Sequence, residues 1–203
     1  MLEVLHRKIQ QMHAALGSVV SKDFSQAKIV RTDTRTSTTL KYTFGPEDDA
    51  IQLANSASLL IANIASIKDH LRHWCQEQKI EFSGEKLINN NASVALIHDL
   101  WNIDKHGKLT SPPRSGLTPK LLDLKTNMLV RARSSVQIMF VPTADGGWLP
   151  QTNGDGTVEL ALMGRIVDET GREIAEFLTT CEKAAEAWQQ ELERSGVRLS
   201  NDA

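Results

Sequence analysis

The chain has 203 residues, of which 40% are apolar, 24% charged and 5% aromatic. This is the composition of an ordinary globular protein, and it excludes collagen-like, mucin-like and wholly disordered chains. The formal net charge of −2 excludes a strong general attraction to nucleic acid or an anionic membrane, but a small basic pocket is compatible with it. Because the sequence has neither an apolar run of about 18 residues nor a signal peptide, we expect no membrane partner and a cytoplasmic location with reduced cysteines.

The first part of the chain is predicted to be helical with one pair of strands. Apolar residues at steps of four and three predict a helix over 2–16. Residues 27–44 are rich in Thr, Val, Ile and Tyr, which predicts two short strands or a hairpin. Pro46, followed by three acidic residues, is typical of a helix start, and the helix predicted over 46–79 carries a sustained apolar seam.

The helix over 46–79 has a second stripe of mostly small residues on its opposite side. Small residues allow another helix to approach closely. That helix belongs either to the interior of the same bundle or to a second copy of the chain, so a homodimer through 46–79 is one expectation. The stripe consists of Ile51, Asn55, Ser58, Ala62, Ala65 and Asp69.

A further helix is predicted over 92–106, and its two ends are well marked. Residues 89–91 are three asparagines, which form a loop with a ready N-cap. Gly107 is suited to end the helix, and residues 111–119 form a turn-rich linker after it.

Beyond the linker the period of the sequence changes from helix to strand. Residues 128–142 and 157–167 alternate like strands, and Asp-Gly turns join them over 143–156. These strands form an antiparallel β elaboration over 120–168. A C-terminal packing helix follows over 171–195, with one apolar face.

The sequence therefore predicts an α+β fold in a single domain over 1–203. We expect a bundle of about four helices with an inserted or appended antiparallel sheet.

One side of the helix over 92–106 carries an Asp, an Asn and a His. At 100° per residue, Asp99, Asn102 and His106 form a polar stripe beside the apolar seam. Such groups can accept, orient and transfer protons, which indicates a candidate catalytic site. A stripe of this kind can equally tie a helix to its neighbour, so a structural role stays open.

The amino-acid sequence around this stripe resembles sequences of known proteins. Residues 99–106 are similar to an N-x-D-K-H element of a widespread group of uncharacterised bacterial proteins, and Ile67–Leu71 matches the L-D-H-L-like sequence that precedes it there. The two elements together resemble HEPN domains, helical bundles whose second conserved helix bears an R-N-x-x-x-H motif. Asn102 and His106 match the Asn and His of that motif, whereas Trp101 stands at the position of the Arg.

The HEPN resemblance covers about residues 46–110 and implies a metal-independent ribonuclease or RNA-processing toxin, usually with a site assembled across a dimer. In the implied reaction an RNA 2′-hydroxyl attacks its own phosphodiester. His106 is then the general acid or base, Asn102 orients a phosphate oxygen or the imidazole, and Asp99 fixes the tautomer of His106. Because Trp101 cannot stabilise the transition state as Arg does, the alternative is a non-catalytic helical protein that binds a nucleotide, RNA or a protein partner.

Three more side chains are candidates for binding contacts. Lys105 or Arg72 could replace the missing Arg if the fold brings either across the site. We expect His70 to be a neighbour of His106 and Asp69 to be an interhelical partner. The sequence contains no metal-ligand spacing, phosphate loop or dinucleotide fingerprint, so we expect neither a metal nor a cofactor.

Overall fold

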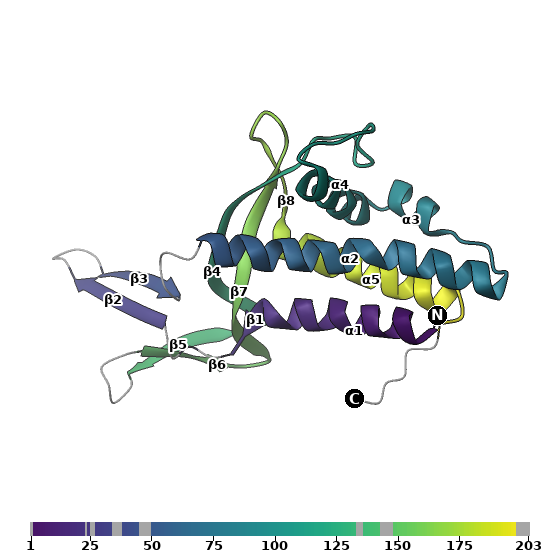
Figure 1. Ribbon diagram of the computed structural model, residues 1–203. Coiled ribbons are helices and arrows are strands. Elements are labelled where there is room, and N and C mark those ends of the chain that lie inside the picture. The colour runs from purple at the N-terminus through teal and green to yellow at the C-terminus, as the bar shows by residue number, and fades with distance from the viewer. Residues whose placement is uncertain are drawn as a thin grey trace.

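The helices lie together in one layer of the molecule, and the longest strands cross one end of that layer (Figure 1). The computed structural model describes residues 2–22, 24, 27–33, 38–44, 50–132, 136–142 and 148–197. In this part of the chain five helices and eight strands form, which confirms the predicted α+β class. The helices are α1 (Leu2–Ser18), α2 (Ala50–Gln78), α3 (Gly84–Asn90), α4 (Ala92–His106) and α5 (Phe177–Arg194).

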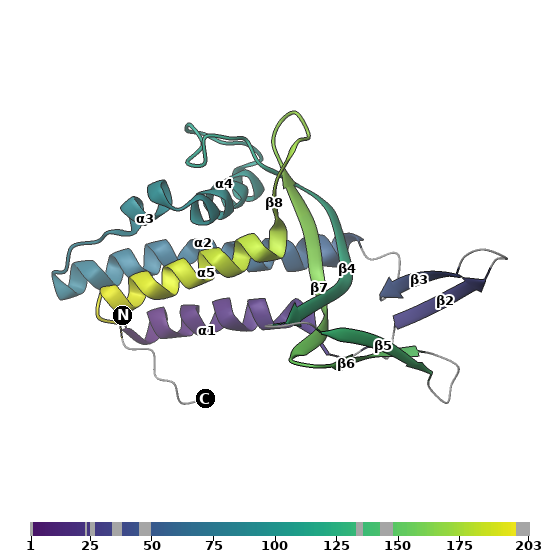
Figure 2. The same ribbon diagram turned by 180° about the vertical axis from the view of Figure 1, so that it is seen from behind.

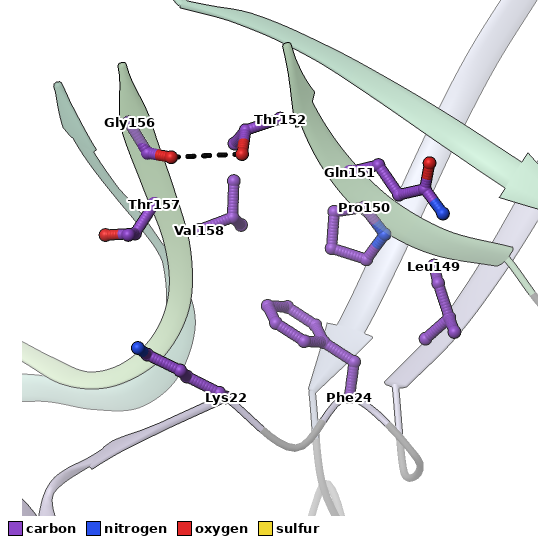
Figure 3. Close-up of a pocket in the computed structure, with 9 residues that line it drawn as sticks. All are labelled: Lys22, Phe24, Leu149, Pro150, Gln151, Thr152, Gly156, Thr157 and Val158. Atoms are coloured by element: carbon purple, nitrogen blue, oxygen red, sulfur yellow. Dashed lines mark hydrogen bonds between the residues drawn. The ribbon is translucent and has the colours of Figure 1, made fainter. Parts of the chain in front are cut away.

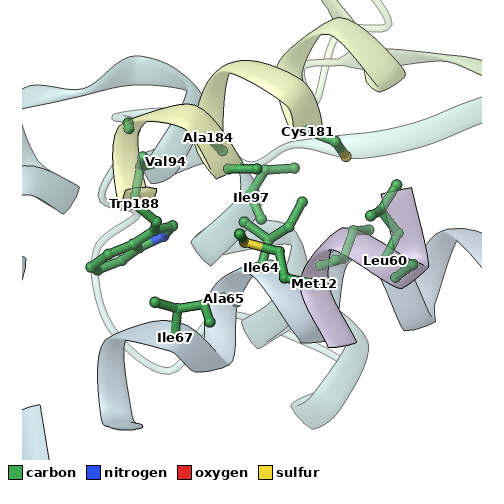
Figure 4. Packing of buried hydrophobic residues seen from close by; sticks show 14 of the residues in the cluster. Met12, Leu60, Ile64, Ala65, Ile67, Val94, Ile97, Cys181, Ala184 and Trp188 are labelled. Carbon is green, nitrogen blue, oxygen red and sulfur yellow. The ribbon is translucent and has the colours of Figure 1, made fainter. Parts of the chain in front are cut away.

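A hydrophobic cluster joins the helices to one another. The seam predicted along 46–79 is buried in α2, where it packs against α1, α4 and α5. Met12 of α1 and Trp188 of α5 are among its partners (Figure 4). Full burial of one large apolar side chain contributes about 1.5–3 kcal/mol, so α2 is the central stabilising element of the bundle. The fully buried members of the seam are Leu60, Ile64, Ile67 and Leu71.

α2 is also the one helix in the described chain that is long and apolar enough to cross a membrane, judged by length and composition alone. Of its apolar 18-residue window 33% is buried inside the fold. The contacts with α1, α4 and α5 account for the apolar seam of this helix. Residues 46–49, where we expected the helix to begin, lie outside the described residues.

The two ends of α4 form as the sequence predicts. The Asn91 side chain accepts hydrogen bonds from the backbone N–H groups of Ser93 and Val94, both at 3.1 Å, and so caps the start of the helix. Gly107 ends the helix in the left-handed conformation, with φ of 71°, and its N–H donates to the carbonyl of Ile103. The polar stripe of α4 is therefore held at fixed positions along a well-defined helix.

The main sheet is antiparallel and is built around β7 (Gly156–Val167). β1 (Val20–Ser21) and β4 (Lys120–Ala132) pair with β7 on either side, and β8 (Glu173–Glu176) pairs with its end. The view from behind shows the long β4–β7 pair standing across the end of the helical layer (Figure 2). Buried residues of β7 join the same hydrophobic cluster as the helices, so sheet and bundle share one core.

Two hairpins lie beyond this sheet. β2 (Ala27–Asp33) and β3 (Thr38–Phe44) form the first, which confirms the two strands predicted over 27–44. β5 (Gln137–Pro142) and β6 (Trp148–Asn153) form the second. Both hairpins project from the end of the molecule that carries the sheet (Figure 1).

The strand boundaries predicted over 128–167 are partly wrong. β4 begins at Lys120, within the predicted sheet but well before the predicted strand. Residues 148–153, predicted as part of a turn region, form β6, because their backbone groups pair with β5. Residues 148–153 thus form a strand because they pair with β5, and not because of a local alternation of side chains.

Two helical predictions also need correction. Residues 84–90 form α3 where no helix was expected, so Asn91 ends one helix and begins the next. The helix predicted over 171–195 begins only at Phe177, since residues 173–176 pair with β7 as β8. The Glu176 side chain then caps α5 by accepting hydrogen bonds from the N–H groups of Leu178 and Thr179.

Candidate functional site

α4 places the four predicted residues of its last two turns in different surroundings. Asp99 is 1% exposed, and Asn102 is half-buried. Lys105 and His106 are exposed at the end of the helix. The polar stripe of α4 therefore runs from the core at Asp99 to the solvent at His106, and its side chains do not gather at one site.

The Asp99 carboxylate is bound by the linker after α4. It accepts hydrogen bonds from the backbone N–H of Arg114 at 3.0 Å, the backbone N–H of Ser115 at 2.8 Å and the Ser115 hydroxyl at 2.7 Å. Both oxygens are used, and the partners come from one turn of the linker. We predicted that Asp99 orients His106. In the structure the Asp99 carboxylate instead binds the linker.

The same linker turn is tied to α3. The Arg114 guanidinium donates to Asn89 at 2.8 Å and forms an ion pair with Glu85 at 3.1 Å. Glu85 is also the partner of Arg72, which reaches across from α2. Asp99 and Glu85 thus join α2, α3, α4 and the linker through one set of polar contacts.

Asn102 contacts a histidine that the sequence analysis did not single out. Its side-chain amide lies 3.0 Å from Nδ1 of His98, which is one helical turn earlier and 7% exposed. On the other side of the ring, Nε2 of His98 lies 3.4 Å from Nζ of Lys68 on α2. The signal that could have found His98 is its i, i+4 spacing to Asn102.

Burial and the neighbouring Lys68 ammonium both favour the neutral form of His98. An ammonium group has no lone pair, so it can only donate, and Nε2 must accept. Nδ1 then carries the proton. The Asn102 atom placed 3.0 Å from it is Nδ2, so a hydrogen bond here requires the amide to turn its oxygen toward the ring. Burial lowers the pKa of His98 below its usual value, and the charge of Lys68 lowers it further. His98 is thus neutral near pH 7.

Trp101, at the position of the motif arginine, lies between His98 and Lys105. The Trp101 and His98 rings meet edge to face, with centroids 6.0 Å apart. The Lys105 ammonium lies over the Trp101 ring, 5.0 Å from its centroid. Trp101 is half-buried and packs against the core, so α4 presents a partly exposed indole with a cation on it.

His70 and Arg72 lie away from this end of α4. Ser58 contacts Asp104 and Lys68 contacts His98, so α2 and α4 run antiparallel. His70 is about 18 Å further along α2 than Ser58, at 1.5 Å per residue. The expectation that His70 neighbours His106 is therefore wrong.

His70 and Arg72 have other partners. Burial lowers the pKa of His70, and the next cause is the charge of Lys8 on α1. The Arg72 guanidinium pairs with Glu85 and lies over the Phe82 ring, 5.1 Å from its centroid. Arg72 thus joins α2 to α3, and neither residue reaches the exposed end of α4.

Known proteins do not identify the chain. No protein-family model, no curated protein and no solved structure matches it. Among the described residues no group of three His, Cys, Asp or Glu side chains is placed to hold a metal ion. The groups available at the end of α4 are an aromatic ring, one lysine, one histidine and the carboxylate of Asp104.

The exposed end of α4 adjoins an uncovered face of α2. The Ser58 hydroxyl donates to Oδ1 of Asp104 at 3.3 Å, which brings the first half of α2 beside the last turn of α4. On this half of α2 the side chain of Ile51 is 76% exposed and that of Leu59 is 57% exposed. Residues 50–67 carry no charged side chain. A surface without charged side chains, on which Ile51 and Leu59 are exposed, thus lies beside the last turn of α4.

Proposed function

We propose that the protein is a non-catalytic, HEPN-like binding protein whose exposed end of α4 binds RNA or a nucleotide. The observation that carries this proposal is the Lys105 ammonium over the partly exposed Trp101 ring, at the same end of α4 as the exposed His106. A cation and an aromatic ring together match a phosphate and a base of single-stranded RNA. The free thiols of Cys75 and Cys181 fit the cytoplasmic location that belongs to this proposal.

The contacts of Asp99 favour binding over catalysis. A ribonuclease of the implied type needs one group to take a proton from the 2′-hydroxyl and one to deliver a proton to the leaving oxygen. Asp99 is occupied by the linker, and Asn102 is occupied by His98. His106 is then left without either of its two predicted helpers on the same helix.

The test is binding of a short, fluorescently labelled single-stranded RNA, measured by anisotropy at several salt concentrations. We expect Lys105→Met to weaken binding about fivefold, since one partly solvated phosphate contact contributes about 1 kcal/mol. It should also reduce the dependence of binding on salt, since fewer counterions are released. Lys86→Met, at an exposed lysine of α3, is the matched control and should leave binding unchanged. Equal binding by both variants, or no binding, contradicts the proposal.

A ribonuclease is the second candidate, and the exposure of His106 favours it. A second copy docked on the uncovered face of α2 would lie beside the end of α4 and could supply the groups that one chain lacks. We therefore propose a homodimer through the first half of α2. RNA cleavage that is lost in His106→Ala would replace the binding proposal with this one.

The homodimer has its own test in light scattering coupled to size exclusion. Leu59→Glu places a charge on the proposed contact and should give a monomer. Ile80→Glu is a matched control, because Ile80 is 43% exposed and follows the other end of α2. A dimer that survives Leu59→Glu, or a monomeric wild type, contradicts the α2 contact without bearing on RNA binding by one chain.

A further inference from the structure

A cavity of about 680 Å³ opens at the far end of the molecule from α4. It lies between β6, the start of β7 and the segment that follows β1 (Figure 3). Figures 1 and 2 both place α4 and the β5–β6 hairpin on opposite sides of the helical layer. The cavity is therefore separate from the proposed RNA surface, and its volume is that of a site for a small molecule.

The cavity has an apolar floor built around one aromatic ring. Phe24 is 9% exposed, and its ring points into the cavity toward Pro150 (Figure 3). Val158 lines the same space from β7, and Leu149, 40% exposed, forms an apolar lip. A planar ring bound here would contact the Phe24 ring and the flat face of a proline, both rigid groups that lose little freedom on binding.

The polar groups of the cavity favour an anion. Lys22 is the one charged residue among the nine that line it, and its side chain is exposed. The Thr152 hydroxyl already donates its proton to the carbonyl of Gly156 at 3.0 Å, so toward a ligand it can only accept. Gln151 and Thr157 can donate. Among the described residues that line the space none is acidic, so an anionic ligand meets no direct repulsion from these side chains.

We propose that this cavity binds a small molecule that combines a planar apolar ring with one anionic group. The ring occupies the floor formed by Phe24, Pro150 and Val158. The anionic group, a carboxylate, sulfonate or phosphate, lies at the rim beside Lys22. This assignment is independent of the RNA proposal, since it shares no residue with the end of α4.

The proposal is tested with anilinonaphthalene sulfonate, a fluorescent probe that has both an aromatic body and an anionic group. We expect saturable binding with an increase in fluorescence. Indole acetate should displace the probe at lower concentration than neutral indole or acetate alone, because only the first supplies both features. In amide NMR spectra the signals that shift should be those of residues 149–152 and 156–158.

Two variants separate this cavity from other apolar surfaces. Lys22→Met removes the charge and keeps the aliphatic stem, so probe affinity should fall about fivefold. Lys125→Met, at an exposed lysine of β4 outside the cavity, should leave the affinity unchanged. Val158→Phe reduces the space and should weaken binding of the probe, with circular dichroism as the check on folding. Equal affinity in the wild type and Lys22→Met, or NMR shifts confined to α2, overturns the assignment.

Discussion

Nζ of Lys68 lies 3.4 Å from Nε2 of His98, in a half-buried contact between α2 and α4. Two basic side chains meet where two helices pack, and the Asp69 carboxylate that pairs with Lys68, at 3.6 Å, comes from the same helix as Lys68. The pair is compatible with folding only while one member is neutral, because two cations at this distance repel strongly where water is scarce. His98 is the member whose pKa is lowered.

The first prediction is that stability falls in mild acid. The pKa of His98 is lowered in the folded protein by burial and by Lys68, whereas an unfolded chain has the ordinary value of about 6.5. Below that value the unfolded state binds a proton that the folded state does not, so the free energy of unfolding decreases as pH falls. The slope for one proton is at most about 1.4 kcal/mol per pH unit. Urea unfolding at a series of pH values measures it.

Lys68→Met identifies the cause of this dependence. The variant keeps the aliphatic stem and removes the charge, so the pKa of His98 should rise toward its ordinary value while burial still holds it down. The loss of stability below about pH 6.5 should therefore become smaller but should not disappear. His70 contributes in the same direction, because burial and the charge of Lys8 on α1 lower its pKa. An unchanged slope in Lys68→Met rules out the contact as its origin.

The second prediction concerns the role of Asp99. Asp99→Asn replaces an acceptor-only group with one that carries two N–H donors, and at least one of them then faces the N–H groups of the linker. We expect a loss of about 2–4 kcal/mol in the free energy of unfolding, since hydrogen bonds to a buried charge are lost. Asp104→Asn, at an exposed acid of the same helix, should change stability by less than about 0.5 kcal/mol.

The Asp99 variants also separate a structural role from a catalytic one. If Asp99 holds the linker, Asp99→Asn lowers the melting temperature and leaves RNA affinity per folded molecule unchanged. A variant that folds with wild-type stability but has lost an RNA-dependent activity would instead place Asp99 in a catalytic site. Thermal unfolding gives the melting temperature of the variant, and anisotropy of labelled RNA on the same sample gives its RNA affinity.

The third prediction tests the boundary of α4. A Cβ atom added at Gly107 would meet no atom within 4 Å. Gly107→Ala should therefore lower the free energy of unfolding by about 1 kcal/mol, because alanine disfavours the left-handed backbone conformation. Gly17 lies inside α1 with equally open space and no positive φ, so Gly17→Ala should stabilise the protein by up to about 1 kcal/mol. Equal effects of the two substitutions, measured by urea unfolding, would show that backbone conformation is not the cause.

The local sequence was sufficient to predict those elements whose structure depends on interactions between residues close in the chain. The end of α4 follows from Gly107, because only glycine adopts the required φ without strain. The buried seam of α2 follows from its steps of three and four. The β2–β3 hairpin follows from a run of β-branched residues that extends on both sides of a polar centre.

Partners distant in the sequence account for what could not be predicted. Residues 173–176 become a strand because β7 offers them a pairing edge, although the same residues can extend the helix that follows. The carboxylate of Asp99 belongs to the helix face that the sequence predicts, but its partner Ser115 comes from a linker whose path is set by tertiary contacts. His98 has one local partner, Asn102, but its second partner, Lys68, is 30 residues earlier in the chain and could not be predicted from the local pattern.

The fourth prediction concerns the two thiols. Cys75 and Cys181 have no exposed surface, and burial raises the pKa of both, that of Cys181 well above its usual range. A thiol reacts with a disulfide reagent as the thiolate, so both burial and the raised pKa slow the reaction. A chromogenic aromatic disulfide should therefore leave both thiols intact in the native protein near pH 7 and modify both in concentrated urea. Because Cys181 of α5 is fully buried in the hydrophobic cluster, its modification should follow global unfolding, at a rate that rises with urea as the unfolding rate does. Rapid modification of Cys181 without unfolding would show that α5 detaches from the bundle on its own.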